Sequence, residues 1–269
     1  MRRFLPYLKK NKTFHTYVGK RLLKFIITSG SFPMAELVLD EHFMTSAEAV
    51  QCAAKAANIA LLRWQLANGA SYFSANGEFV SADSEEVFNI WRDTLVSSEN
   101  GEGAFNWYSI KGARNHAQAT RLASFWTEQH TLHSFSKDIL GQALLWTAQV
   151  NYSLVLAAAL IECGADVNYR GRRNAETALN ALHWVAKKTT RDAAHLAEFL
   201  LLSGADPNVQ VYITSGRRKG EKVTPSMEPG AKGISKWLGK SWDELVDWAA
   251  EARRQQEGVG VSSVTRPED

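Results

Sequence analysis

The 269-residue sequence lacks the features that mark several specialised classes of protein. Its two cysteines, Cys52 and Cys163, supply neither a disulfide framework nor a Cys-x-x-Cys metal pair. No run of about 18 apolar residues is present, so the sequence predicts no transmembrane helix. The N-terminus has no long apolar stretch before a small-residue cleavage site, so a secretory signal is not expected. These absences predict an intracellular protein, cytoplasmic or nuclear, with both thiols in the core.

Motifs of catalysis and cofactor binding are missing as well. No Gly-x-Ser-x-Gly elbow occurs, and residues 216–220 read GRRKG without the ending of a phosphate-binding loop. His130 and His133 are close in sequence, but no Glu follows in a His-Glu-x-x-His frame and no Cys lies near them. The sequence therefore predicts no enzyme activity, no cofactor, no metal and no small-molecule substrate. An unrecognised active site in the aromatic-rich residues 74–140 is the enzymatic alternative.

Basic residues are concentrated at the N-terminus. Residues 1–35 hold eight basic and no acidic side chains, whereas the rest of the chain is acidic on balance. Residues 1–18 are expected to form a basic arm, whose simplest role is that of a solvated end of the fold. The alternative is a nucleic-acid or anionic-membrane binder, whose affinity would fall steeply with salt because bound counterions are released. A mitochondrial targeting segment fits less well, because the arm is not rich in serine.

Apolar residues recur with helical spacing through most of the chain. Residues 19–42, 46–70, 137–168 and 179–208 each favour two short antiparallel helices joined by a turn. Ser46 is expected to cap the first helix of its segment, and Asp192 is expected to cap the helix after residue 190. The fold class predicted is therefore all-α.

Other segments depart from this pattern. Residues 74–140 are expected to hold one degenerate repeat and an insertion, and residues 209–232 a long loop with brief strand pairing at most. Ser241 and Glu244 form a capping box, which predicts a C-terminal cap helix over residues 241–254. Residues 256–269 are expected to be a flexible tail.

One stretch occurs twice. Residues 156–168 read LAAALIECGADVN, and residues 196–208 read LAEFLLLSGADPN. Gly164 and Gly204 suit the position after a helix, where a positive φ is required, and the Asp and Asn suit a tight turn. A helix end repeated with the same turn chemistry is typical of a repeat array.

These residues resemble the ankyrin-repeat family, whose unit of about 33 residues carries a T-P-L-H-x-A signature. Residues 180–186 read NALHWVA, in which Leu182, His183 and Ala186 match the signature, although Thr-Pro is missing. The resemblance is best over residues 141–210 and fair over residues 19–72. It implies a solenoid of stacked antiparallel helix pairs over residues 19–255, with projecting loops or short hairpins. It also implies that His183 bonds neighbouring backbone.

The resemblance further implies a non-enzymatic protein–protein interaction module that binds another protein through its loops. Aromatic and arginine side chains in the loops are the best candidates, because such residues dominate binding energy at interfaces. These candidates are Tyr72, Phe73, Tyr169, Arg170, Arg172, Arg173, Tyr212, Arg217 and Arg218.

Overall fold

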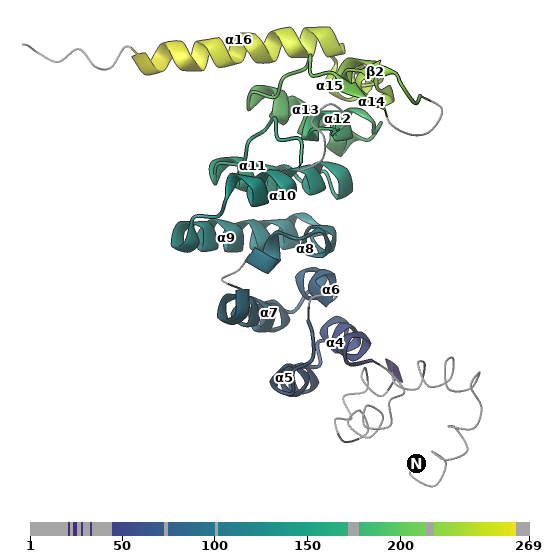
Figure 1. The fold of residues 1–269 in the computed structure, drawn as a ribbon, viewed down its shortest axis with the longest axis vertical. Helices are drawn as coiled ribbons and strands as arrows, with labels where there is room; N and C mark the ends of the chain where they lie inside the picture. The colour runs from purple at the N-terminus through teal and green to yellow at the C-terminus, as the bar shows by residue number, and fades with distance from the viewer. Residues whose placement is uncertain are drawn as a thin grey trace, which may run out of the picture. The chain divides into compact units, whose positions relative to one another are not determined.

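The computed structural model describes residues 45–72, 75–99, 102–171, 178–213 and 218–261, together with five single residues between 21 and 33. These residues are mostly helical, and they include a single pair of two-residue strands, so the all-α prediction is confirmed (Figure 1). The basic arm over residues 1–18 lies outside the described residues. The chain divides into two compact units, Met1–Arg114 and Asn115–Asp269, and each is described by itself below.

The first unit consists of short helices in two rows. One row contains α4, α6 and α8, which contact one another in succession, and the other contains α5 and α7. The helices are α4 (Ser46–Lys55), α5 (Ile59–Ala67), α6 (Asn76–Ser81), α7 (Glu85–Glu99) and α8 (Trp107–Gly112), and the 3-10 helix η2 (Glu102–Phe105) precedes α8. The core between the rows includes the fully buried side chains Phe79, Trp91, Leu95 and Ile110.

Two predicted helix caps are displaced in the structure. Thr45, not Ser46, caps α4, because its hydroxyl accepts from the Glu48 amide while the Glu48 carboxylate accepts from the Thr45 amide. Thr190, not Asp192, caps the helix that follows it, and Asp192 lies in the first turn. In both cases the cap is the residue whose side chain reaches the amide three positions later.

Helices occupy most of the region 74–140. This region contains α6, α7, η2 and α8, and then α9, and the degenerate repeat with an insertion stays a prediction. Asn76 starts α6 and accepts a hydrogen bond from the Trp91 indole (2.9 Å). Gly77 and Gly112 serve helix packing, as the contact between them shows.

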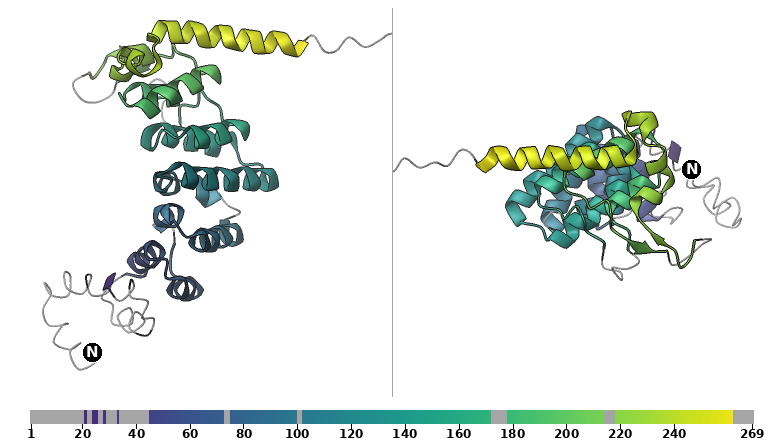
Figure 2. Two further views of the ribbon diagram at one scale, coloured as in Figure 1. Left: turned by 180° about the vertical axis from the view of Figure 1, so that it is seen from behind. Right: turned by 90° about the horizontal axis from the view of Figure 1, so that it is seen from above.

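The second unit repeats the arrangement in two rows. α9, α11, α13 and α16 contact one another in succession, and α10, α12 and α14 form the other row (Figure 2, left). The helices are α9 (His116–His133), α10 (Lys137–Val150), α11 (Leu154–Glu162), α12 (Ala181–Ala186), α13 (Arg191–Leu202), α14 (Pro229–Lys232), α15 (Ser235–Leu238) and α16 (Trp242–Val261).

The segment 209–232 is more ordered than the predicted long loop. β1 (Val211–Tyr212) pairs antiparallel with β2 (Lys222–Val223), and the hairpin projects beside the helices (Figure 2, right). η3 (Pro225–Met227) and α14 follow directly. Pro225 and Pro229 each begin a helix, because proline fits the first helical position.

The last helix begins near the predicted position and ends later. Ser241 and Glu244 form the predicted capping box, since each accepts from the amide of the other (3.3 and 2.7 Å). α16 continues beyond Arg254 to Val261, so the predicted tail from residue 256 begins too early. The buried side chains Trp242, Leu245 and Ala249 recur with helical spacing and pack toward α13, while Asp243, Asp247 and Glu251 are exposed.

The repeated turns have the same geometry. Gly164 and Gly204 adopt φ of +93° and +95° after α11 and α13. Asp166 accepts from the Asn168 amide (2.9 Å), and Asp206 accepts from the Asn208 amide (2.8 Å). The Asn168 side chain also joins the two turns, because it donates to Gly204 O (3.1 Å) and accepts from the Asp206 amide (2.8 Å). One side chain thus ties consecutive turns together.

Replacing this side chain should destabilise the second unit measurably. Asn168→Ala removes both hydrogen bonds between the turns and should lower the free energy of unfolding by about 1.5 kcal/mol. Asn208→Ala is the matched control, because Asn208 holds the same turn position but its side chain is exposed. The control should change stability by less than about 0.5 kcal/mol. Urea unfolding followed by circular dichroism measures both, and equal effects would contradict the role of Asn168 as a tie.

Candidate functional site

The first candidate loop contains Tyr72 and Phe73. Tyr72 is half-buried, and its carbonyl accepts from the Ala75 amide (2.8 Å), which starts the turn into α6. Phe73 lies outside the described residues. The structure therefore describes only Tyr72 of this pair, and it places that residue at the entry to α6.

The second candidate loop follows the first repeated turn. Tyr169 is half-buried, and its ring lies against the backbone of α10 at Gly141. A Cβ at position 141 would lie 2.7 Å from Cδ2 of that ring, so the contact needs a glycine. Arg170 is also half-buried, whereas Arg172 and Arg173 lie outside the described residues. Tyr169 thus fixes the loop to α10, and Arg170 is its better candidate for an external contact.

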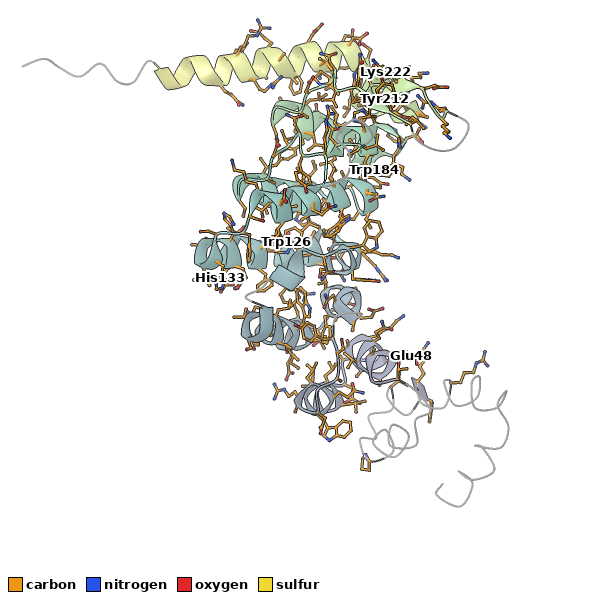
Figure 3. The ribbon with its side chains drawn as sticks, viewed as in Figure 1. Glu48, Trp126, His133, Trp184, Tyr212 and Lys222 are labelled. Atoms are coloured by element: carbon orange, nitrogen blue, oxygen red, sulfur yellow. The ribbon has the colours of Figure 1, made fainter. Side chains whose placement is uncertain are left out.

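The third candidate loop is the β1–β2 hairpin. Tyr212 is 39% exposed, and Lys222, its cross-strand neighbour, places Nζ 5.1 Å from the ring centroid (Figure 3). Arg218 donates to Glu221 (2.9 Å) and to Glu228 (3.2 Å). Arg217 lies outside the described residues. Arg218 is therefore engaged within the chain, and Tyr212 remains available at the surface.

Glu228 is a buried carboxylate beside basic groups. Its side chain is 3% exposed, and Arg218 is the ion-pair partner of its Oε2. Burial lowers the pKa of the Lys187 ammonium, and the nearby Glu228 charge opposes this effect. A buried carboxylate is stable only when paired, so this pair fastens the hairpin to the segment that precedes α14.

Two of the described histidines, His183 and His130, lie in structural positions. His183 is fully buried in α12, where its Nδ1 lies 2.7 Å from Asn180 Oδ1, the oxygen that also caps the helix. Burial lowers the pKa of His183 to about 4, although the nearby backbone of Val223 and Val209 acts in the opposite direction. His130 Nδ1 accepts from the Phe135 amide (3.1 Å).

The acid sensitivity of the fold should depend on His183. Because its pKa is lower in the folded state, the unfolded chain takes up a proton first as the pH falls below the ordinary value of 6.5. The contribution of the neutral, buried His183 side chain to the free energy of unfolding is present above pH 6.5, and it is lost as the pH falls toward 4. Between about pH 7 and about pH 5, His183 should therefore account for about 2 kcal/mol of lost stability.

Urea unfolding at several pH values, with His183→Gln as the comparison, measures this contribution. The variant should be less stable than the parent at neutral pH, and its stability should fall less on acidification. If the free energy of unfolding fell equally with pH in the two proteins, the interpretation of His183 as a buried neutral histidine would be contradicted.

The two cysteines are buried to different extents. Cys163 is buried and Cys52 is half-buried, and both thiols are free. Burial is the largest influence on each and raises the pKa of both thiols. A raised pKa lowers the fraction of reactive thiolate, as expected for core thiols.

Metal and membrane features were also considered. In the part of the chain that the structure describes, no group of three His, Cys, Asp or Glu side chains is arranged to hold a metal ion. Across that same part, every helix is either too short or too polar to traverse a bilayer.

The sequence analysis missed one recurring feature of the second unit. Lysine ammonium groups lie over the rings of Trp184, Tyr212, Trp237 and Trp248, at 4.7 to 5.1 Å from the ring centroids. In three of the four cases the lysine lies within eight residues of its aromatic partner, so spacing along residues 184–248 could have indicated these pairs.

No family model, curated protein or solved structure matches this chain.

Proposed function

We propose that this chain is a non-enzymatic protein–protein interaction module, built as an ankyrin-like solenoid. The observation that carries the proposal is a pair of hydrogen bonds (3.1 and 2.8 Å) from the Asn168 side chain to the second copy of the repeated turn, at Gly204 and Asp206. A bond between equivalent turns is what a stack of repeats requires, because each repeat gains its stability from its neighbours. The two rows of helices within each unit support the same reading.

The described side chains favour binding over catalysis. The most shifted histidine, His183, is fully buried and hydrogen-bonded to the cap of its own helix, so it has no route to a substrate. The buried Glu228 is paired with Arg218. Exposed aromatic and basic residues lie instead in the loops and the hairpin, the positions that a repeat scaffold presents to a partner.

Site-specific photo-crosslinking in the full chain tests the proposal. A photoreactive residue at Arg170 or Tyr212 should form covalent adducts with a protein partner in cell extract. The same residue at Asp247, on the exposed face of α16, is the matched control and should give fewer adducts. Adducts at Asp247 alone, or with nucleic acid alone, would refute a loop-based protein interaction.

A further inference from the structure

Lys187 and Lys188 are adjacent in the chain but lie in different surroundings. Lys187 follows α12 directly and is half-buried, and its Nζ lies 4.8 Å from the centroid of the Trp184 ring. Lys188 is exposed. An ammonium group is attracted to the face of an indole ring, so the contact restricts the Lys187 side chain. The two lysines therefore share their sequence neighbours and differ in their structural environment.

The backbone around Lys187 is fixed by two later segments of the chain. α14 touches the end of α12, because a Cβ at Gly230 would lie 2.6 Å from the carbonyl oxygen of Ala186. From α15, the Trp237 indole N–H donates to the carbonyl oxygen of Thr189 (3.0 Å). Lys187 thus lies in a turn that α14 and α15 hold against α12, and this packing shields part of its side chain from water.

Glu228 and Arg218 place opposite charges near Lys187. Glu228 is buried, and its Oε2 is bonded to Arg218 (3.2 Å). Burial is the largest influence on the pKa of the Lys187 ammonium and lowers it; the Glu228 charge opposes this effect, while Arg218 and Lys188 add to it. At neutral pH, Lys187 therefore holds a larger fraction of neutral amine than a lysine with the ordinary pKa.

We propose that Lys187 is a site of covalent modification, at which a small acyl phosphate acylates the side-chain amine. The lone pair of the neutral amine attacks the acyl carbon, and a C–N bond forms as the C–O bond to phosphate breaks. Phosphate leaves with the electron pair of that bond, and the proton released by the nitrogen passes to solvent. Only the neutral amine is nucleophilic, so a partly desolvated lysine beside other cations is the favoured position.

The charges around Lys187 favour an anionic acyl donor. Arg218 and Lys188 both act on Lys187 as positive charges. The Arg218 side chain is 38% exposed, whereas that of Glu228 is 3% exposed, so a donor that arrives from solvent meets cations before the carboxylate. Cations near the reacting group also stabilise the phosphate that leaves. An uncharged thioester would gain neither advantage.

Acylation would change the local interactions of this turn. It removes the positive charge of Lys187 and with it the attraction to the Trp184 ring. The inference goes beyond the proposed function and does not depend on it, because it concerns the chemistry of one side chain.

Acetylation of the full chain by acetyl phosphate tests the inference, with fragment mass spectrometry to assign each acetyl group to Lys187 or Lys188. In the folded chain Lys187 should react at least about threefold faster than Lys188, although Lys188 is the more exposed. In concentrated urea the two lysines should react at similar rates, because the folded environment is then lost. S-acetyl-N-acetylcysteamine, an uncharged thioester, should show a smaller preference for Lys187.

Two glutamate variants separate the effect of the buried charge from that of the fold. Glu228→Gln should react about twofold faster or more at Lys187, because the carboxylate that stabilises the ammonium is gone. Glu221→Gln is the matched control, since it removes the other carboxylate bonded to Arg218, and it should react as the parent does. Circular dichroism checks that both variants fold.

Three results would overturn the inference: acetylation of Lys188 as fast as Lys187 in the folded parent, a preference for Lys187 that persists in urea, or equal rates at Lys187 in the two glutamine variants. A preference that is as large with the uncharged thioester would overturn the assignment of an acyl phosphate as donor. If Glu228→Gln does not fold, the comparison of the folded and unfolded parent decides by itself.

Discussion

A chain that ends at Lys240 is expected to be far less stable than the full chain and to aggregate. This truncation removes α16, whose Trp242, Leu245 and Ala249 are at most 7% exposed. Burial of a large apolar side chain contributes about 1.5–3 kcal/mol, so the loss should amount to about 5 kcal/mol. The apolar surface of α13 that α16 covers would also become accessible to other molecules, as in a repeat array without its terminal cap.

Size-exclusion chromatography and thermal unfolding measure the result. A chain that ends at Val261 is the matched control, because it keeps all of α16, and it should be monodisperse with parent-like stability. Two point variants separate the buried and exposed faces: Leu245→Ala should lower stability by about 3 kcal/mol, and Asp247→Ala by less than about 0.5 kcal/mol. A soluble, cooperative protein ending at Lys240 would show that α16 is not a cap.

The sequence predicted best those features that depend on neighbouring residues. The turns at Gly164 and Gly204 were predicted correctly, because the positive φ of the glycine and the following Asx bonds are local properties. The capping box at Ser241 was predicted for the same reason. The bond from Asn168 to the next turn could not be derived, since it depends on how the two turns are placed in space.

Two of the candidate binding residues make contacts within the chain that composition does not show. Tyr169 belongs to a polar loop and was predicted to be a contact residue, and its ring packs on α10, where Gly141 leaves room. Arg218 was chosen for its charge and is engaged with Glu221 and Glu228. The contact of Tyr169 depends on a residue that is distant in sequence, whereas Glu221 is an i,i+3 neighbour of Arg218 and is visible in the sequence.

Gly77 and Gly112, in the region 74–140, lie where two helices meet. In the sequence, Lys-Gly-Ala at residues 111–113 echoes the repeated Gly-Ala turn. In the structure both glycines are helical, and α6 contacts α8 at this point. A Cβ at Gly112 would lie 2.8 Å from the Cα of Gly77 and closer still to its carbonyl oxygen. The glycines therefore permit two helix backbones to touch.

Gly112→Ala is accordingly expected to destabilise the first unit strongly. In an unconstrained helix the change would be favourable by up to about 1 kcal/mol, because alanine has the higher helix propensity. Here the new methyl group meets helix backbone, which has no rotamer to relieve the clash, so α6 and α8 must separate. Because overpacking typically costs 1–3 kcal/mol and sometimes more, we expect a net loss of about 3 kcal/mol.

Two variants make the Gly112 experiment specific. Gly77→Ala should be milder, because its Cβ would lie 3.1 Å from the Tyr108 carbonyl oxygen, a distance that a small shift relieves. Lys111→Ala, an exposed neighbour in the same helix, should change stability by less than about 0.5 kcal/mol. Urea unfolding followed by circular dichroism measures the stability of all three variants. The order of stability expected is Lys111→Ala, then Gly77→Ala, then Gly112→Ala, because the close approach of the two backbones is tightest at Gly112. A Gly112→Ala variant as stable as the parent would mean that α6 and α8 do not meet through their backbones.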